Sequence, residues 1–268
     1  MPHRNQQFVD IETRDGVRWL WLNRPELGNA FDDRVIKQLS DQIAQAVHAN
    51  DVRMIVLGGR GKHFSAGADF NWMQRMVALS YDENTEDALQ LARLMRQLNE
   101  CPKPTIAAVN GAAYGGALGL ICACDLAIAA TNATFCLSEV KLGLIPAVIS
   151  PFVINAMGRR NAMRYMLTAE VFNAATARDV GVVHEIVEQD SLYATVEAWT
   201  STLAKNGPRA LVEVKKLIRD VQGRRIDDDL SEMTAERIAR IRVSPEGQEG
   251  LRAFLDKRAP AWRSRDST

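Results

Sequence analysis

The chain has 268 residues, of which 47% are hydrophobic, and its 33 basic and 33 acidic side chains leave no net charge. This length allows one large domain or a domain with an appendage. The balanced charge argues against nucleic-acid binding, which needs a basic surface. We find no secretory signal and no apolar stretch of about 18 residues, so we expect a cytoplasmic protein without a membrane span.

The first sixty residues predict a hairpin, a helix and a buried strand. Residues 8–23 contain two apolar runs around Asp15-Gly16, a typical two-residue turn. A helix is expected after Phe31, because apolar side chains recur there every fourth residue. The run at 52–59 is short, apolar and ends in glycines, which indicates a buried strand.

The middle of the chain alternates between predicted strands and helices. After a loop at 59–70 comes a polar stretch near 81–87 that we interpret as mobile, followed by a helix over 85–100. Strands are then expected at 104–110, 125–130, 133–139 and 182–187, and helices at 148–180 and 191–205. The pattern is typical of an α/β fold.

Beyond Asn206-Gly207-Pro208 only helical patterns occur. One helix is expected to begin at Ser244-Pro245-Glu246, where serine suits the N-cap and proline the first turn. We therefore divide the chain into a core, residues 1–205, and a helical region, residues 206–268.

The cysteines and histidines give no support for a metal site. Neither C-x-x-C nor zinc-type spacing occurs among the four cysteines, and no two of the four histidines stand four residues apart. We expect no metal, and we expect the thiols to be small buried groups in a reducing compartment.

Two glycine-rich loops follow predicted strands, FSAGADF at 64–70 and AAYGGALGLI at 112–121. Such a segment can simply allow a helix to pack closely on a strand. Alternatively, each loop can aim one backbone N–H group at the same developing negative charge, which is how an oxyanion hole is built. Neither loop has the spacing of a dinucleotide-binding motif or a P-loop.

Three motifs in order, LNRPELGNAF, HFSAGADF and NGAAYGGALGL, resemble the crotonase (enoyl-CoA hydratase/isomerase) superfamily. The resemblance covers essentially the whole chain. It implies a core of ββα units arranged in a spiral and a C-terminal helical region that assembles homotrimers, often paired as hexamers. It also implies an acyl-CoA thioester as the substrate, with coenzyme A being part of that substrate rather than a separate cofactor.

The same resemblance implies a set of site residues. The backbone N–H groups of Ala68 and Gly116 would hold the thioester oxygen while an enolate forms. The residues expected along the coenzyme A moiety are Asn29, Ala30, Ala68, Asp69, Phe70, Asn71 and Gly116.

Relatives that add water usually carry two catalytic glutamates. The position of the first is Gly119 here, whereas Glu139 matches the second, so we expect Glu139 to be the acid/base. An ion pair with Lys141 or a charge at a helix start is the alternative interpretation of Glu139. One carboxylate suits an isomerase, and it also serves a hydratase if it both activates water and returns the proton.

The segment CLSEVKLGLIPAVISPFV and the tail IRVSPEGQEGLRAFLDKRAPAW resemble bacterial methylglutaconyl-CoA hydratases, which act in leucine breakdown. The resemblance implies hydration of 3-methylglutaconyl-CoA, whose distal carboxylate would compensate for the missing glutamate. Lys141 and His63 are the basic candidates to bind that carboxylate, by proximity in the sequence alone.

Several other functions remain open from the sequence. They are a Δ3,Δ2-enoyl-CoA isomerase, a generic short-chain enoyl-CoA hydratase, and a catalytically inactive binding module on the same fold. A serine hydrolase using Ser65 and His184 is weakly supported, because the G-x-S-x-G motif is absent. We interpret Asp69 and Asp125 as acids that brace their loops rather than as catalytic groups.

Overall fold

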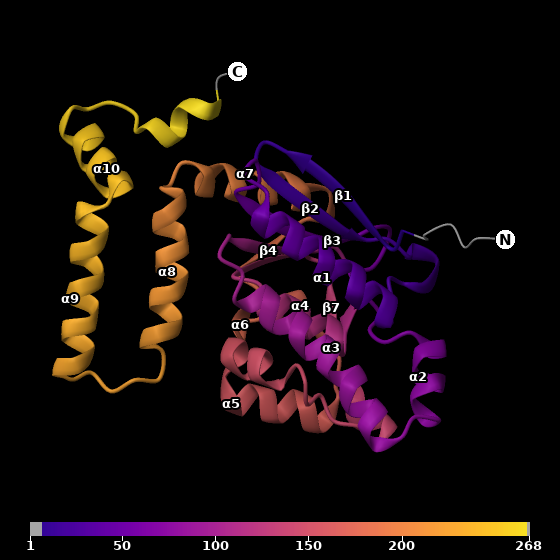
Figure 1. Ribbon diagram of the computed structural model, residues 1–268. Helices are drawn as coiled ribbons and strands as arrows, with labels where there is room; N and C mark the ends of the chain where they lie inside the picture. The colour runs from indigo at the N-terminus through magenta and orange to yellow at the C-terminus, as the bar shows by residue number, and fades with distance from the viewer. Residues whose placement is uncertain (1–6, 267–268) are drawn as a thin grey trace. The chain divides into compact units, whose positions relative to one another are not determined.

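The computed structural model describes residues 7–266, which form two units (Figure 1). The first unit comprises the chain up to Cys101 together with Thr105–Glu197. The second comprises Pro102–Pro104 and the chain from Ala198 onward. The fold is mixed α/β, with a sheet core in the first unit and helices at the C-terminal end of the chain.

A six-stranded sheet in the order β1-β2-β3-β4-β6-β9 forms the core of the first unit. The strands are β1 (Val9–Arg14), β2 (Val17–Leu22), β3 (Met54–Gly59), β4 (Thr105–Val109), β6 (Leu126–Ala130) and β9 (Glu185–Val187). Within this sheet only the β1–β2 pair is antiparallel. Its turn at Asp15 and Gly16 has φ angles of 50° and 73°, which confirms the predicted hairpin.

The first unit also contains a smaller three-stranded sheet, in the order β5-β7-β8. It consists of β5 (Ala113–Tyr114), β7 (Thr134–Cys136) and β8 (Phe172–Asn173). The sequence pattern did not predict β8, which lies inside the region expected to be helical. Parallel pairing of β5 with β7 places Tyr114 opposite Cys136, and so brings the glycine segment close to the chain leading to Glu139.

Four helices of the first unit pack against one another in sequence: α1 (Asp33–His48), α3 (Tyr81–Asn99), α4 (Gly116–Ala123) and α5 (Ser150–Thr168) (Figure 1). Helix α1 also contacts β1 and β2, and α4 contacts β4. Helix α4 is uncharged, and six of its eight residues are buried. A helix that is apolar all round belongs in a core, which explains the composition of the glycine segment.

The region between β3 and β4 differs from the prediction. Helix α2 (Phe70–Val77) was not predicted, and the polar stretch near 81–87 is the first part of α3 rather than a mobile segment. The side chain of Ser80 accepts the Glu83 N–H, and the Glu83 carboxylate accepts the Ser80 N–H, so that a capping box fixes this end of α3.

The remaining helices include α6 (Ala174–Asp179) and α7 (Leu192–Ala204). In the second unit, α8 (Pro208–Val221), α9 (Asp228–Val243) and α10 (Pro245–Leu255) contact one another. The predicted helix start is confirmed, because Ser244 accepts the Gly247 N–H and Pro245 begins α10. Glu246 also accepts the N–H groups of Arg209 and Ala210 at 3.0 and 2.8 Å, which links α10 to the start of α8.

Candidate active site

Segments 28–31, 65–69 and 112–116 lie side by side in the first unit. Ala66 N–H donates to the Gly28 carbonyl at 2.8 Å. On the opposite side, Ser65 N–H donates to the Ala112 carbonyl at 3.0 Å and the Ser65 carbonyl accepts the Tyr114 N–H at 3.1 Å. The two glycine-rich loops of the sequence are therefore direct neighbours.

The direction of the Ala68 N–H group follows from its peptide bond. The Gly67 carbonyl accepts the Phe31 N–H at 2.9 Å, and the Asp69 N–H donates to the Phe31 carbonyl at 3.0 Å. In a planar trans peptide the N–H points opposite to the C=O. The Ala68 N–H therefore points away from Phe31, and among residues 7–266 it has no hydrogen-bond acceptor.

The Gly116 N–H group is likewise directed outward. It belongs to the first residue of α4, and the Gly115 carbonyl of the same peptide accepts the Leu118 N–H at 2.9 Å inside the helix. The Gly116 N–H thus points out of the N-terminal end of α4, where the helix dipole favours negative charge. No acceptor for it occurs in the described part of the chain.

Two glycines in these loops are required by geometry. Gly115 has φ 55° and ψ −125°, and Gly67 has φ 99°, conformations that side-chain-bearing residues rarely adopt. A Cβ on Gly67 would lie 2.9 Å from the Tyr114 carbonyl oxygen. The absence of side chains therefore allows the two loops to approach each other.

Glu139 lies beside Gly115, at the start of the 3-10 helix η2 (Glu139–Leu142). A Cβ on Gly115 would be 3.2 Å from Glu139 Oε1. The other carboxylate oxygen, Oε2, is buried without a hydrogen-bond partner. Burial raises the pKa of Glu139, while a backbone hydrogen bond at the same residue lowers it in part.

This environment contradicts one part of the alternative interpretation of Glu139, the ion pair with Lys141, whereas its position at the start of η2 agrees with the other part, a charge at a helix start. Among residues 7–266, neither Lys141 nor any other cationic side chain forms an ion pair with Glu139. A carboxylate oxygen that is buried without a hydrogen-bond partner, as Glu139 Oε2 is, is costly to keep, and such groups cluster at functional sites. Glu139 stays the expected acid/base, and its Oε2, buried without a partner, is the observation behind that expectation.

Gly119 has no space for a side chain. A Cβ there would lie 2.3 Å from Ile149 Cγ2 and 3.1 Å from Met95 Cε. Ile149 is 2% exposed and thus part of the core. The site therefore has an apolar wall at the position where two-glutamate relatives carry their first carboxylate.

Gly119→Ala is expected to lower the free energy of unfolding by about 1–2 kcal/mol, measured by urea denaturation. Alanine favours a helix by about 1 kcal/mol over glycine, but overpacking a core costs about 1–3 kcal/mol. In an Ile149→Ala background the same substitution should become stabilising, because the methyl group then fills the cavity. Equal effects in both backgrounds would contradict direct contact between the two positions.

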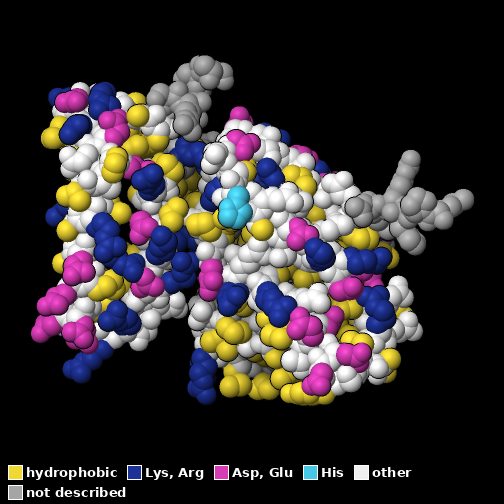
Figure 2. All heavy atoms as spheres, in the orientation of Figure 1, with side chains coloured by type: hydrophobic (Ala, Val, Ile, Leu, Met, Phe, Trp, Pro, Cys, Tyr) yellow, Lys and Arg dark blue, Asp and Glu magenta, His cyan; other side chains and the backbone are white. Residues whose placement is uncertain are grey.

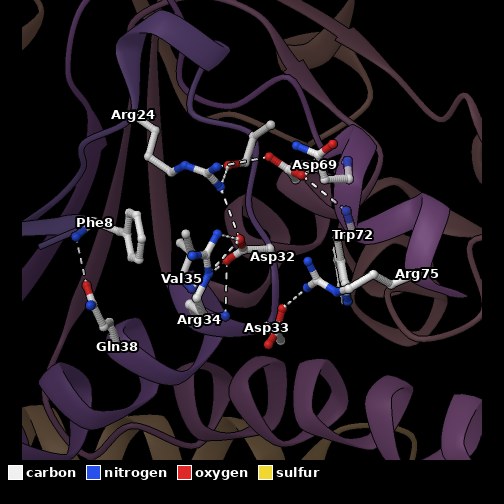
Figure 3. A network of polar contacts seen from close by, with 12 residues as sticks. Phe8, Arg24, Asp32, Asp33, Arg34, Val35, Gln38, Asp69, Trp72 and Arg75 are labelled. Atoms are coloured by element: carbon white, nitrogen blue, oxygen red, sulfur yellow. Dashed lines mark hydrogen bonds and ion pairs between the residues drawn. The ribbon is translucent and has the colours of Figure 1, made fainter. Parts of the chain in front are cut away.

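A buried charge network holds the loop that carries Ala68 (Figure 3). Arg24 is 7% exposed and donates to Asp69 Oδ2 at 3.0 Å and to the Ala30 carbonyl at 2.9 Å, and it lies 3.5 Å from Asp32 Oδ2. Asp69 Oδ1 accepts the N–H groups of Asn71 and Trp72, which caps α2. The predicted bracing role of Asp69 is confirmed.

The pKa of Asp32 is lowered within this network. Burial alone would raise it, but hydrogen bonds from Arg34 and from the Val35 N–H, together with the charges of Arg34 and Arg24, outweigh that effect. Asp32 is therefore held as a carboxylate in the core.

The other expected binding residues surround the same loops. Asn29 is 1% exposed, and its side chain donates to the carbonyls of Arg60 and His63 at 2.8 and 2.7 Å, so it braces the 60–63 turn. Ala30 is buried and offers its carbonyl to Arg24. Phe70 and Asn71 are exposed on the first turn of α2.

A hydrolase site is not assembled. Ser65 Oγ accepts the Gly67 N–H, whereas His184 Nδ1 accepts the Ala127 N–H. Asp125 accepts hydrogen bonds from the Thr105 N–H and hydroxyl, which confirms it as a brace. Within residues 7–266 no cluster of metal-ligating side chains occurs, and no helix is long and apolar enough to cross a membrane.

Sequence reasoning missed the contributions of Arg24 and Phe31. Both lie in the motif LNRPELGNAF, which marks the region but not the contacts. Arg24 reaches Asp69, and the Phe31 ring packs against Gly116, where a Cβ would be 2.7 Å from Phe31 Cζ.

Comparison with known proteins identifies this architecture as a crotonase fold, as the sequence resemblance implies. A crystal structure of an enoyl-CoA hydratase from Shewanella pealeana is 47% identical, with a TM-score of 0.93 over 96% of each chain. A 1,2-epoxyphenylacetyl-CoA isomerase of Escherichia coli is 31% identical over 96% of this chain and 98% of its own. A 2,3-dehydroadipyl-CoA hydratase of the same species is 29% identical over 95% of this chain and 98% of its own. The enoyl-CoA hydratase/isomerase family model matches residues 12–265, and the chain belongs to that family.

Proposed function

We propose that this protein hydrates the 2,3-double bond of 3-methylglutaconyl-CoA, giving 3-hydroxy-3-methylglutaryl-CoA. The observation that carries the proposal is the half-buried carboxylate of Glu139, which lies beside Gly115 and whose Oε2 has no hydrogen-bond partner. The N–H groups of Ala68 and Gly116, in the two neighbouring loops, have no acceptor among the described residues. The family membership supports an acyl-CoA thioester as the substrate.

The proposed reaction uses few groups. The thioester carbonyl accepts hydrogen bonds from the Ala68 and Gly116 N–H groups, which stabilise the negative charge that develops on its oxygen. Glu139 removes a proton from water as the water oxygen bonds to C3, and then returns that proton to C2. The carboxylate ends the cycle as it began, so the reaction requires no separate cofactor.

Two features support the dicarboxylic substrate. The chain resembles methylglutaconyl-CoA hydratases around Glu139 and in the tail, and its relative in Escherichia coli bears the name of a hydratase for 2,3-dehydroadipyl-CoA. Ile149 fills the space beside Gly119, so that of positions 119 and 139 only the second contributes a carboxylate, that of Glu139. Lys141, exposed on η2, and His63, with a buried unpartnered Nδ1, are the candidates for the distal carboxylate.

Isomerisation is the second candidate function. Moving a proton between two carbons needs only one carboxylate, and a 31% identical relative is named as an isomerase. The two functions differ in whether water enters the product.

We also propose a homotrimer, or a dimer of trimers, built through residues 206–268. Exposed apolar side chains on those helices support self-association, namely Val214, Ile218, Ile238, Val243, Leu251, Phe254 and Leu255. In the first unit, apolar side chains also gather over α5, where Ile154, Met163 and Leu167 are exposed (Figure 2). All four cysteines are free thiols, which supports a reducing cytoplasm as the location.

A substrate panel tests the proposed function. The protein is incubated with 3-methylglutaconyl-CoA, crotonyl-CoA and a 3-enoyl-CoA in H₂¹⁸O, and absorbance and product mass are followed. We expect ¹⁸O in the product. We also expect kcat/KM to be about 10–100-fold higher for 3-methylglutaconyl-CoA than for crotonyl-CoA, which is the effect of one charge-assisted hydrogen bond. Turnover of the 3-enoyl-CoA alone, without label, would favour the isomerase.

A further inference from the structure

We propose that Phe31 is the positioning residue that sets the spacing between the Ala68 and Gly116 N–H groups, a role that rests on the proposed function. Phe31 is 3% exposed and lies against both loops. It forms an isolated parallel bridge with Ala68, and its ring abuts Gly116. Phe31 therefore contacts both residues whose N–H groups are the proposed donors, Ala68 and Gly116.

The backbone of Phe31 orients the first donor. Its N–H holds the Gly67 carbonyl at 2.9 Å, and its carbonyl holds the Asp69 N–H at 3.0 Å. The peptide between Gly67 and Ala68 is thereby fixed, and so is the direction of the Ala68 N–H. Any residue other than proline at position 31 would supply these two hydrogen bonds.

The ring of Phe31 limits how closely α4 can approach. A Cβ on Gly116 would meet Phe31 Cζ at 2.7 Å and Cε2 at 3.3 Å, so the ring lies against the first residue of the helix. The Trp72 ring lies 6.4 Å from the Phe31 ring, centroid to centroid, and its Nε1 is fixed by Asp87 at 3.0 Å. A smaller side chain would remove this spacer and leave the Gly116 N–H free to shift relative to the Ala68 N–H.

Such a shift acts on the transition state more than on substrate binding. The enolate oxygen carries its full charge only as the reaction proceeds, so misplaced donors lower kcat while leaving KM nearly unchanged. A displacement of about 1 Å in a preorganised site is enough to lower the rate about 100-fold.

The test compares Phe31→Leu with Phe172→Leu. Phe172 is 5% exposed and packs on Phe135 and Tyr165, so its truncation controls for the loss of core packing. We expect Phe31→Leu to lower kcat about 10–100-fold with KM changed less than about threefold, and Phe172→Leu to leave kcat unchanged. Phe31→Met has about the same side-chain volume as Phe31→Leu, but its unbranched side chain reaches farther toward Gly116, so it should restore part of kcat.

Infrared spectroscopy supplies a readout that packing alone would not move. The probe is 3-methylglutaryl-CoA with ¹³C in the thioester carbonyl, which has no double bond to hydrate. Binding to the wild-type protein should lower the carbonyl stretching frequency, and Phe31→Leu should reduce that shift. An undiminished shift, with kcat falling no more than in Phe172→Leu, would overturn the positioning role. Failure of the wild-type protein to bind the probe would instead overturn the proposed function and the role that rests on it.

Discussion

Glu139→Gln is expected to lower kcat for hydration by about 10²–10⁴-fold, the usual contribution of a positioned acid/base. Glutamine keeps the shape of the side chain but cannot accept a proton from water or return it to carbon. Binding of the thioester should persist, because the Ala68 and Gly116 N–H groups are unchanged. Steady-state kinetics with 3-methylglutaconyl-CoA measures the effect, and Glu188→Gln, at an exposed glutamate, is the matched control.

The pH dependence of the wild-type protein should follow the ionisation of the same carboxylate. Burial raises the pKa of Glu139, so kcat/KM is expected to fall as pH drops through a midpoint above the ordinary glutamate value of about 4.3. A rate that stays flat below neutral pH, or full activity in Glu139→Gln, would remove Glu139 from its proposed role.

Glu139→Gln is expected to lower kcat but to raise stability at neutral pH. A carboxyl group whose pKa is raised by folding stabilises the fold below its unfolded pKa, and that contribution is lost as pH rises through the folded pKa. At neutral pH the ionised Glu139 therefore opposes folding. Glu139→Gln should have a melting temperature above that of the wild type at pH 7, which distinguishes a lost catalytic group from an unfolded protein.

The parts of the fold that could be predicted are those fixed by local patterns. The Asp15-Gly16 turn, the apolar runs of β3 and β4 and the Ser244-Pro245 helix start each contain their own signal. Helix α2 was missed because its eight residues are too few for a clear period. The start of α3 was misinterpreted because that part of the helix is polar and faces solvent.

The candidate site was predictable only in part for a similar reason. The two glycine-rich loops were marked by composition, and Ala68, Gly116 and Glu139 by the resemblance to a family. The filling of the space beside Gly119 by Ile149, and the clamping of Asp69 by Arg24, are contacts between residues 30 and 45 positions apart. Nothing in the local sequence sets such pairs, because tertiary packing decides them.

Arg24→Met is expected to lower the free energy of unfolding by about 3–5 kcal/mol, the cost of removing one member of a buried ion pair. Methionine replaces much of the apolar stem but leaves Asp69, 4% exposed, and Asp32, 0% exposed, without the guanidinium. The Ala30 carbonyl also loses its donor. Urea denaturation at pH 7 measures the loss.

Arg60→Met is the matched control for Arg24→Met. Arg60 also bonds to two carboxylates, Asp10 and Glu12, but its side chain is 35% exposed and theirs are 33% and 40% exposed. Because water can solvate these acids once the arginine is gone, the loss should be about 1 kcal/mol or less. Equal losses in the two variants would mean that burial does not set the cost of the Arg24 network.

Lowering the pH should reduce the difference in unfolding free energy between the wild type and Arg24→Met. The pKa of Asp32 is lowered in the folded protein, so its stabilising contribution is present above the unfolded value of about 3.9 and is lost as pH falls through the folded pKa. In Arg24→Met the folded pKa should rise, since burial remains and one positive charge is gone. As pH falls, Asp32 is then protonated at a higher pH in the variant than in the wild type, which removes the cost of its buried charge. A difference in unfolding free energy that stayed constant from pH 7 to about pH 3 would show that the buried carboxylates do not depend on Arg24.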